Sequence, residues 1–408
     1  MNTLEQLSSS KANRAASQEF ASRVPKLLVV TTIAATARAF LLPYAEHFRS
    51  MGWKVDLLAN RAPGSPECAA SYDSVFDIDW SRNPLAFGNL RALRRIRDVF
   101  ANNSYDLVHV HTPVSSFLTR FALRSKRKAT GTAVIYTAHG FHFHTHGSRL
   151  QNCFFLSLEK IAAPWTDSMI VMNQEDYDAA LRYKLVDKAN LHFTRGIGVN
   201  PENYSGTAGN EPQISDMRRA LGLGPDDFLF LMVAEFTARK RQADAVRALA
   251  VTNSPTFHIA FAGEGPTLEK SKRLATELGI ESRTHFLGKR DDIPALLHAS
   301  NALLLTSSHE GLPRSVLEAL CAGVPVIGSD VRGTRDLLAH GAGVLFPTGD
   351  VSRLAAAMRQ IASHPDAARC MGERGRAQAA GYAIDPLLLQ HERIYSDVLR
   401  TKSGVDNV

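Results

Sequence analysis

The chain has 408 residues, of which 45% are hydrophobic and 21% are charged, and its formal net charge is +7. This length favours two domains with a core each, and no apolar run approaches the roughly 18 residues that a membrane-spanning helix needs. The positive charge favours anionic partners: phosphorylated small molecules, an anionic membrane face or nucleic acid. Nucleic acid ranks last, because the sequence has no nucleic-acid-binding motif.

The N-terminal segment and the cysteines bear on the compartment. Residues 1–22 are polar and lack the apolar stretch of a signal peptide, so we interpret them as a flexible N-terminal extension. The cysteines are far apart and show no paired spacing, which argues against a disulfide framework or a zinc site. We therefore expect a cytosolic, reducing compartment.

Short apolar runs alternate with amphipathic segments from residue 23 to residue 200. Helices are expected at 38–51, 90–100 and 114–126. The apolar runs that predict strands are 26–33, 53–59, 74–78, 107–111, 134–138 and 168–172. Alternation of this length predicts a parallel sheet with helices on both faces.

A polar stretch rich in Gly, Asn, Pro and Glu follows at 201–215 and predicts an interdomain linker. The alternating series restarts at 216–382 as a second domain, and 383–408 predicts a C-terminal helix packing back on the N-terminal domain. Strands of the second domain are predicted at 228–233, 257–261, 285–287, 303–306, 324–327 and 343–346. The fold class is therefore α/β, with two Rossmann-like doubly wound domains facing each other across a cleft, a default place for a ligand.

The stretch SSHEGLPRSVLEAL, from Ser307 to Leu320, follows one of these strands and leads into a helix. Pro313 suits the first helical position, and the amides after Glu310 are expected to offer a phosphate site supported by the helix dipole. Glu310 and Glu318 lie on either side of this site, as if each bound hydroxyls of a nucleotide-sugar. The alternative is a solvated helix residue at 318 and a dipole-favoured acid at 310.

Two further motifs suggest chemistry. Lys240 follows a strand and begins a helix, which places a cation where a pyrophosphate would lie, although basic turns are more often simply solvated. His139 ends a strand of the first domain, and a lone histidine there is usually structural. His142, His144 and His146 alternate nearby, but no carboxylate or cysteine stands at ligand spacing, so we predict no metal site.

The segment from His309 to Asp336 resembles the donor-site signature of retaining glycosyltransferases of the two-Rossmann, or GT-B, type in glycosyltransferase family 4. That signature is E-x₇-E followed by A-x-G-x-P-V-I. The segments Arg38 to Pro43, Tyr136 to Phe143, Ile161 to Asp176 and Arg195 to Val199 resemble a subgroup that builds capsular and extracellular polysaccharides.

This resemblance implies a metal-independent hexosyltransferase with no cofactor, because the nucleotide-sugar is a substrate. His139, Glu310 and Lys240 match the catalytic positions, with Glu310 on the donor sugar and Glu318 on the ribose. The implied donor-binding residues are Gly198, Arg239, Lys240, Gly263, Glu264, Gly265, Arg290, Glu310, Gly311, Leu312, Pro313, Arg314 and Glu318. The chain departs from the family at Glu235, where an arginine usually contacts the diphosphate, and Arg239 or Arg241 could compensate by reach.

We therefore predict transfer of a sugar from a nucleoside diphosphate, UDP in particular, to a lipid-linked saccharide in exopolysaccharide, capsule or cell-envelope glycan synthesis. A UDP-sugar 2-epimerase on the same scaffold and a non-catalytic scaffold subunit are the alternatives. The predicted location is peripheral, at the cytoplasmic face of the plasma membrane, where each basic residue near the anionic surface adds about 1 kcal/mol. The residues expected to contact it, unless they form an ordinary solvated face, are Arg91, Arg94, Arg95, Lys126, Arg127 and Lys128.

Overall fold

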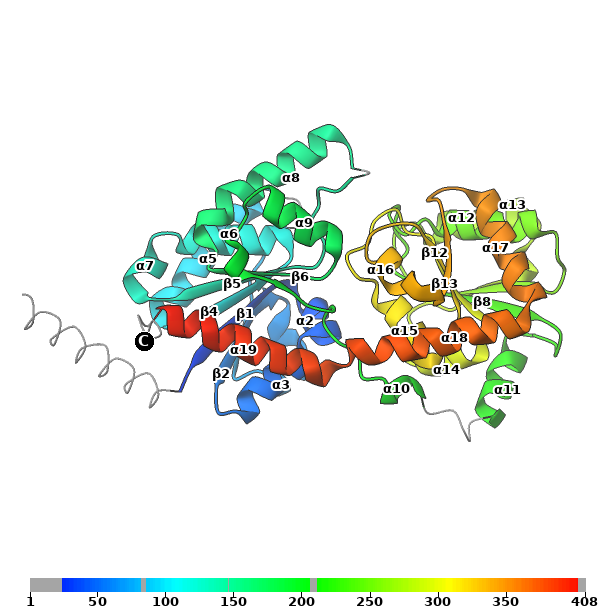
Figure 1. Ribbon diagram of the computed structural model, residues 1–408, viewed down its shortest axis with the longest axis horizontal. Coiled ribbons are helices and arrows are strands. Elements are labelled where there is room, and N and C mark those ends of the chain that lie inside the picture. Colours follow the sequence, from blue (N-terminus) through cyan, green and yellow to red (C-terminus); the bar gives the residue numbers. More distant parts are fainter. Residues whose placement is uncertain (1–23, 82–85, 146, 206–210, 403–408) are drawn as a thin grey trace, which may run out of the picture. The chain divides into compact units, whose positions relative to one another are not determined.

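The computed structural model describes residues 24–81, 86–145, 147–205 and 211–402, so the predicted extension at 1–22 lies outside the described residues (Figure 1). The chain forms two compact units that divide between Ile197 and Gly198. Unit 1 precedes this boundary and also includes the C-terminal helix α19 (Ile384–Lys402) from Asp385 onward. Unit 2 runs from Gly198 to Ile384.

Unit 1 is built on a seven-stranded parallel sheet with the order β3-β2-β1-β4-β5-β6-β7. Its strands are β1 (Lys26–Ile33), β2 (Lys54–Asn60), β3 (Ser74–Phe76), β4 (Leu107–His111), β5 (Ala133–Ala138), β6 (Ser168–Val171) and β7 (Leu191–Phe193). The sequence did not predict β7, because three residues with only one buried side chain leave no apolar run.

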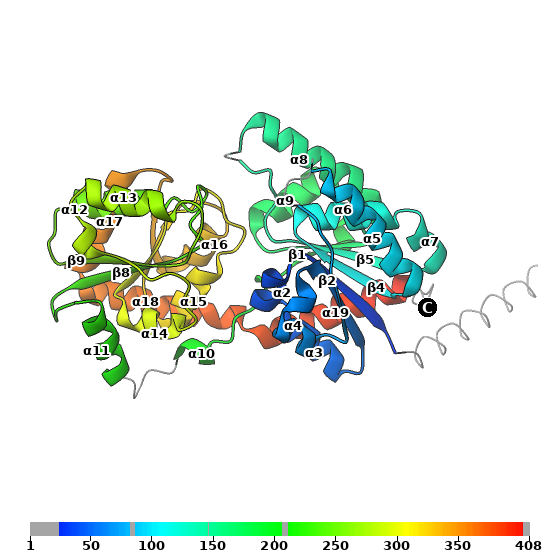
Figure 2. The ribbon, with the colours of Figure 1, turned by 180° about the vertical axis from the view of Figure 1, so that it is seen from behind.

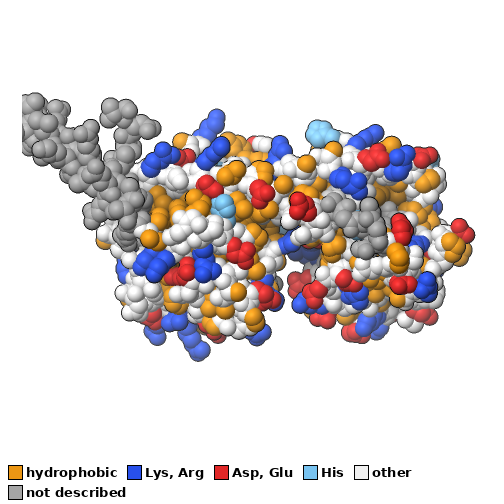
Figure 3. All heavy atoms as spheres, turned by 90° about the horizontal axis from the view of Figure 1, so that it is seen from below, with side chains coloured by type: hydrophobic (Ala, Val, Ile, Leu, Met, Phe, Trp, Pro, Cys, Tyr) orange, Lys and Arg blue, Asp and Glu red, His pale blue; other side chains and the backbone are white. Residues whose placement is uncertain are grey.

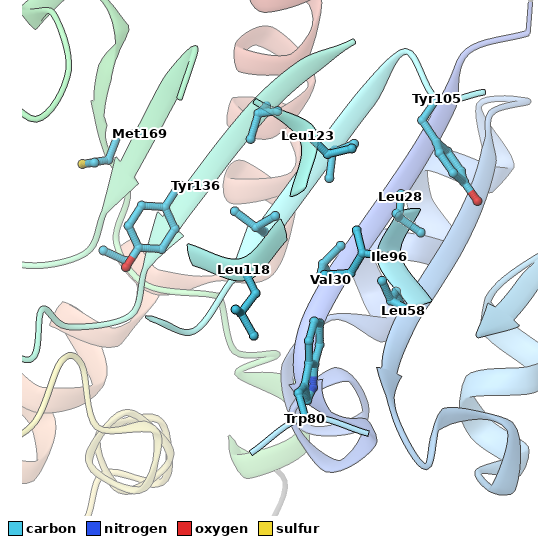
Figure 4. Close-up of a cluster of buried hydrophobic side chains, with 14 of the residues drawn as sticks. Leu28, Val30, Leu58, Trp80, Ile96, Tyr105, Leu118, Leu123, Tyr136 and Met169 are labelled. Carbon is cyan, nitrogen blue, oxygen red and sulfur yellow. The ribbon is translucent and has the colours of Figure 1, made fainter. Parts of the chain in front are cut away.

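Helices cover both faces of this sheet, as the alternating side chains of β1 require. Leu28 and Val30 pack with Leu58, Ile96 and Leu118 beneath one set of helices (Figure 4). On the opposite face β1 packs against α3, α4 and α19 (Figure 2). The helices are α2 (Ala34–Phe40), α3 (Leu42–Ser50), α4 (Pro66–Ser71), α5 (Gly88–Asn102), α6 (Pro113–Leu123), α7 (Lys126–Thr130), α8 (Arg149–Ala162) and α9 (Gln174–Arg182).

The single helix predicted at 38–51 is wrong, because the structure has two helices that meet at Leu41. Pro43 stands at the start of α3, where a proline has no N–H to continue the ladder of the preceding helix. The predicted helix at 114–126 likewise ends at Leu123, and α7 follows as a separate helix.

Unit 2 is built on a six-stranded parallel sheet with the order β10-β9-β8-β11-β12-β13. Its strands are β8 (Phe228–Val233), β9 (Phe257–Ala262), β10 (Thr284–Phe286), β11 (Ala302–Leu305), β12 (Val326–Ser329) and β13 (Gly343–Phe346). Its helices are α10 (Glu202–Ser205), α11 (Glu211–Ala220), α12 (Gln242–Thr252), α13 (Leu268–Glu277), α14 (Ile293–Ala299), α15 (Arg314–Ala322), α16 (Thr334–Leu338), α17 (Val351–Ser363) and α18 (Pro365–Ala379).

The stretch at 201–215 is not a structureless linker. It contains α10 and the first turns of α11, and Tyr204 of α10 is buried in the core of unit 2. A four-residue helix shows no apolar period, so the sequence pattern could not predict it.

Each sheet has a point where the chain reverses its direction of progress across the strands. This point lies between β1 and β4 in unit 1 and between β8 and β11 in unit 2. The loops at the carboxyl ends of two such strands diverge and leave a crevice in which doubly wound folds bind ligands. The loops after β1 and β4 in unit 1, and after β8 and β11 in unit 2, are therefore the places to look for a site, together with the neighbouring strand end of β5.

The predicted basic surface is only partly present. Lys126 Nζ donates a hydrogen bond to Phe100 O, and Arg127, which is 6% exposed, is ion-paired with Asp167. The expectation that Arg127 belongs to an exposed basic patch is therefore wrong, because its guanidinium is buried in an ion pair within unit 1. Within the described residues, we find no helix that is both long and apolar enough to cross a membrane.

Candidate functional site

Two loops of unit 2 are joined at the point where β8 and β11 end. Thr306 Oγ1 donates a hydrogen bond to Lys240 O at 2.7 Å, and the amide of Ser308 donates to Arg239 O at 2.8 Å. These bonds hold the basic loop that follows β8 against the loop that carries Glu310. The cations predicted at one strand end and the carboxylate predicted at the other therefore lie side by side.

Glu310 is the centre of this arrangement and is 7% exposed. Lys240 Nζ donates a hydrogen bond to Glu310 Oε1 at 2.6 Å, and Arg239 Nη1 lies 3.3 Å from Oε2. Burial opposes ionisation of Glu310, but the attraction of Lys240 and Arg239 outweighs it and lowers the pKa of the carboxyl. Glu310 is thus a buried, ionised carboxylate held between two cations.

The two arginines predicted to compensate for Glu235 differ in position. Arg239 contacts Glu310 and also donates to His309 O at 2.7 Å, whereas Arg241 Nε pairs with Asp244 Oδ2 at 2.6 Å at the start of α12. The side chain of Glu235 is exposed. The structure therefore brings Arg239, and not Arg241, to the Glu310 carboxylate.

The turn from Gly311 to Pro313 is held by the loop after β12. A Cβ atom at Gly333 would lie 1.9 Å from Gly311 O, so only glycine allows this approach, and Arg332 Nε donates to Glu310 O at 3.2 Å. Pro313 has an extended backbone and α15 begins at Arg314, so the predicted first helical position of Pro313 is off by one residue. Gly311 and Pro313 are buried, and Leu312 between them is partly buried.

Glu318, on α15, is 8% exposed and accepts two hydrogen bonds through the same oxygen. Arg314 Nε and Tyr204 OH each donate to Glu318 Oε1 at 2.8 Å. Burial, and then the neighbouring carboxylate, raise the pKa of the Tyr204 hydroxyl, which therefore stays a donor. Tyr204 was missed because it stands in the stretch read as a linker, and its only sequence signal is a lone aromatic residue among polar ones.

The glycine loop after β9 approaches the loop that leads to Lys240. A Cβ atom would lie 2.0 Å from Ala234 O at Gly263 and 2.4 Å from Phe236 O at Gly265, so both positions need glycine. Glu264 between them has an exposed side chain, and its carbonyl oxygen accepts from the amide of Phe236.

Two predicted donor-binding residues are engaged elsewhere in unit 2. Arg290 pairs with Asp292 at the start of α14, where its hydrogen bond is the main cause that lowers the pKa of the Asp292 carboxyl. Gly198 has a φ of 81°, and a Cβ there would lie 2.5 Å from Ile384 Cδ1. The structure therefore joins Lys240, Arg239 and Glu310 directly, while Arg290 and Gly198 have separate contacts.

His139 lies in unit 1, directly after β5. Its Nε2 is hydrogen-bonded to Nδ1 of His111, the last residue of β4, at 3.0 Å. Burial, with a smaller contribution from His391, lowers the pKa of His139 to about 4. The imidazole is therefore uncharged near neutral pH, which suits a group that orients a substrate rather than one that carries charge.

The described part of the chain shows no group of three or more His, Cys, Asp and Glu side chains placed to hold a metal ion. The ring of His142 packs against Phe155 with 4.9 Å between centroids, and the amide of His144 donates to Asn152. His146 lies outside the described residues.

Comparison with known proteins identifies the class. Residues 40–194 match the family described as Glycosyltransferase Family 4, and residues 213–378 match Glycosyl transferases group 1. The structure resembles that of Anabaena Alr3699/HepE in complex with UDP and glucose, with a TM-score of 0.77 and 19% identity, over 91% of this chain and 100% of that one. The protein is a glycosyltransferase with the GT-B fold, as predicted.

The sequence relatives narrow this assignment. The chain is 33% identical to the Bacillus subtilis (strain 168) protein named "Putative glycosyltransferase EpsD", over 91% of this chain and 96% of the relative. It is 28% identical to an Escherichia coli UDP-Gal:alpha-D-GlcNAc-diphosphoundecaprenol alpha-1,3-galactosyltransferase, over 63% of this chain and 66% of that protein. The chain belongs to glycosyltransferase family 4, and the predicted resemblance to enzymes of polysaccharide biosynthesis is confirmed.

Proposed function

We propose that this glycosyltransferase moves a hexose from a UDP-linked donor to a lipid-linked saccharide, with retention of configuration, in the synthesis of an exopolysaccharide, capsule or other cell-envelope glycan. The buried Glu310–Lys240 pair at the end of β11 carries the proposal. It places a fixed cation and a fixed hydrogen-bond acceptor beside the turn where a sugar diphosphate would bind. The donor and acceptor in the name of the Escherichia coli relative, and the UDP in the Anabaena complex, support the choice of substrates.

Each acid has a distinct part in donor binding. Glu318 accepts from Arg314 and Tyr204 through Oε1, and both bonds fix its carboxylate. We assign Oε2 to the ribose hydroxyls, because a hydroxyl donating to an ionised carboxylate makes a strong, charge-assisted bond. We assign Glu310 to hydroxyls of the transferred sugar, which its carboxylate oxygens accept through the lone pairs not directed at Lys240 and Arg239.

Lys240 and Arg239 stabilise the leaving group. When the bond between the anomeric carbon and the phosphate oxygen breaks, negative charge accumulates on the diphosphate, and fixed cations lower the energy of that state. Two basic side chains already lie at this point, so the proposed reaction uses no metal ion.

Retention follows if the acceptor attacks from the face that the diphosphate leaves. The acceptor hydroxyl forms the new carbon–oxygen bond on that face, and its proton passes to the departing phosphate oxygen. The chain then supplies position and charge rather than a general base. His139, uncharged near neutral pH, orients the transferred sugar in this scheme.

A donor screen tests the proposal. UDP-, GDP- and ADP-sugars are compared by thermal shift, since a ligand raises stability with the logarithm of its concentration over Kd. We expect UDP-sugars to give the largest shift. Transfer to an undecaprenyl-diphosphate-linked saccharide should then occur with chelator present, and the product should keep the anomeric configuration of the donor.

Two variants and one control complete the test. Glu310→Ala and Lys240→Ala, each shown to be folded, should lose at least about a hundredfold in transfer rate, as expected for removed transition-state contacts. Transfer at the wild-type rate by both variants would refute the site. Conversion of a UDP-sugar to its 2-epimer with no acceptor present would instead establish the epimerase alternative.

We also propose that α5 brings unit 1 to an anionic membrane surface. Leu90 is 63% exposed, and Phe87 is 89% exposed. With Arg91 and Arg94 they share one side of the helix, at spacings of three and four residues. Exposed apolar side chains flanked by basic ones suit a membrane interface, because the apolar side chains can insert among the acyl chains while the basic ones contact the lipid head groups. On the face seen in Figure 3, which is viewed from below Figure 1, basic and acidic side chains are interspersed over both units.

Vesicle sedimentation tests this surface. Binding to vesicles with anionic lipid should weaken about fivefold for each of Arg91→Gln and Arg94→Gln, since one basic residue near the surface contributes about 1 kcal/mol. Arg353→Gln, in unit 2, is a matched control that should bind as the wild type does. Equal binding to neutral and anionic vesicles would contradict the proposal.

A further inference from the structure

Strand β4 and the residue directly after β5 carry buried, uncharged histidines. His109 and His111 occupy alternate positions of β4 and are 2% and 3% exposed. His109 is hydrogen-bonded to Tyr395 OH of α19 and, through Nε2 at 2.6 Å, to Thr137 Oγ1. His111 is hydrogen-bonded to His139 through its Nδ1. Both β4 histidines thus have defined partners, but only His111 is hydrogen-bonded to the residue assigned to the reaction.

A hydrogen bond between two uncharged imidazoles couples their tautomers. Each neutral ring has one nitrogen that donates and one that accepts, so a proton on His111 Nδ1 requires an acceptor at His139 Nε2, and the reverse. Burial keeps the pKa of both rings below the ordinary value, so neither bears a second proton near neutral pH. The tautomer of His139 is therefore set together with that of His111.

The backbone beside His111 is also held in one conformation. Thr112 has φ 64° and ψ 142°, a region that a β-branched residue rarely adopts and that costs about 1–3 kcal/mol. Its Oγ1 is hydrogen-bonded to Thr32 Oγ1 at 2.7 Å and to Ser115 Oγ at 2.6 Å. These contacts fix the end of β4, and with it the direction from which His111 meets His139.

We propose that His111 is a positioning residue for glycosyl transfer: its hydrogen bond to His139 Nε2 holds the ring of His139 in place and couples the tautomer of His139 to its own. Nδ1 of His139 has no hydrogen-bond partner in the part of the chain that the structure describes, and it is the atom left for the substrate. This role rests on the proposed function, in which His139 orients the transferred sugar. It gives His111 an effect on the rate of transfer and not on the affinity for the nucleotide.

The test compares five variants in the full chain, one of which is His139→Ala as the reference. His111→Leu fills the space but removes the hydrogen bond, and it should lower kcat for transfer about ten- to a hundredfold while the donor KM stays within about threefold. His111→Asn can place its amide near the position of Nδ1 and should recover most of the loss. His111→Leu combined with His139→Ala should be no slower than His139→Ala alone, because one interaction is removed in both. His109→Leu, equally buried on the same strand, is the matched control and should keep kcat within about threefold of the wild type.

The outcomes separate this inference from the proposed function. If the wild type transfers sugar and His139→Ala is slow but His111→Leu is as fast as the wild type, only the positioning role is overturned. Equal losses in the leucine and asparagine variants, or in His109→Leu and His111→Leu, would show a packing effect and also overturn it. No transfer by the wild type from any UDP-sugar would instead overturn the proposed function.

Discussion

The side chains at the carboxyl ends of the central strands differ between the two units: they are neutral in unit 1 and charged in unit 2. At the ends of β4 and β5, unit 1 buries the uncharged imidazoles of His111 and His139, which are hydrogen-bonded to each other. At the ends of β8 and β11, unit 2 buries an ionised carboxylate between Lys240 and Arg239. The same doubly wound topology thus supplies a charged site suited to a sugar diphosphate in one unit and a neutral polar site in the other.

The largest expected effect comes from breaking the charged pair. Lys240→Met should lower the transfer rate by about a hundred- to a thousandfold, because the proposed diphosphate site loses one of its two fixed cations. It should also lower the free energy of unfolding by about 3 kcal/mol, since the buried Glu310 carboxylate loses the cation that is hydrogen-bonded to it and keeps only the more exposed Arg239 beside it. Steady-state transfer and denaturant unfolding measure the two losses.

The double variant Lys240→Met with Glu310→Gln separates these losses. Removing the carboxylate's charge should restore most of the stability and none of the activity. A double variant as unstable as Lys240→Met alone would show that packing, and not the unpaired charge, causes the instability.

The second effect is acid destabilisation through the neutral histidines. Burial lowers the pKa of His139 and of His391 to about 4, from an ordinary value of 6.5. Between these values the unfolded chain binds more protons than the folded chain, so stability falls as the pH drops from 6.5 toward 4. Each such histidine should contribute up to about 1.4 kcal/mol per pH unit in that window.

Denaturant unfolding measured at intervals across that window checks this effect. His391→Phe should have a shallower pH dependence than the wild type by about one histidine's contribution, whatever its stability at pH 7. An unchanged slope in this variant would mean that His391 is not a buried neutral group.

A smaller effect is expected at Glu318, the second acid of the proposed donor site. Tyr204→Phe removes one hydrogen bond to Glu318 but keeps the ring in the core, so the Kd for UDP should rise about fivefold, equivalent to about 1 kcal/mol. Isothermal titration measures the change. A Kd equal to that of the wild type would show that Arg314 alone fixes the Glu318 carboxylate.

The smallest effect is expected at Arg290. Its guanidinium is paired with Asp292 at a partly exposed position, and such pairs contribute about 0–1 kcal/mol. Arg290→Ala should therefore raise the Kd for UDP less than about threefold in the same titration. A tenfold rise would show that the arginine leaves Asp292 to bind the nucleotide.

The features that the sequence predicted correctly are those that depend on a local pattern of residues. The strands at 26–33, 107–111, 228–233 and 343–346 have the predicted bounds, because each is an apolar run next to polar residues. The pair of acids was placed correctly on a strand-end turn and a following helix, because both lie in one continuous motif.

Other features depend on contacts between distant segments. Tyr204 and Glu318 are 114 positions apart, and His111 and His139 are 28 apart, so no local pattern indicates either contact. The burial of Arg127 likewise follows from its pairing with Asp167, which a run of basic residues could not reveal.

The division of work between the two units can be tested most directly by measuring UDP-sugar affinity and single-turnover transfer in Glu318→Ala and His139→Ala. We predict that Glu318→Ala weakens donor binding at least about tenfold, since it loses charge-assisted bonds to the ribose. We also predict that His139→Ala changes the Kd less than about threefold but slows transfer about a hundredfold. Equal loss of donor affinity in both variants, or wild-type transfer by His139→Ala, would contradict this division of work.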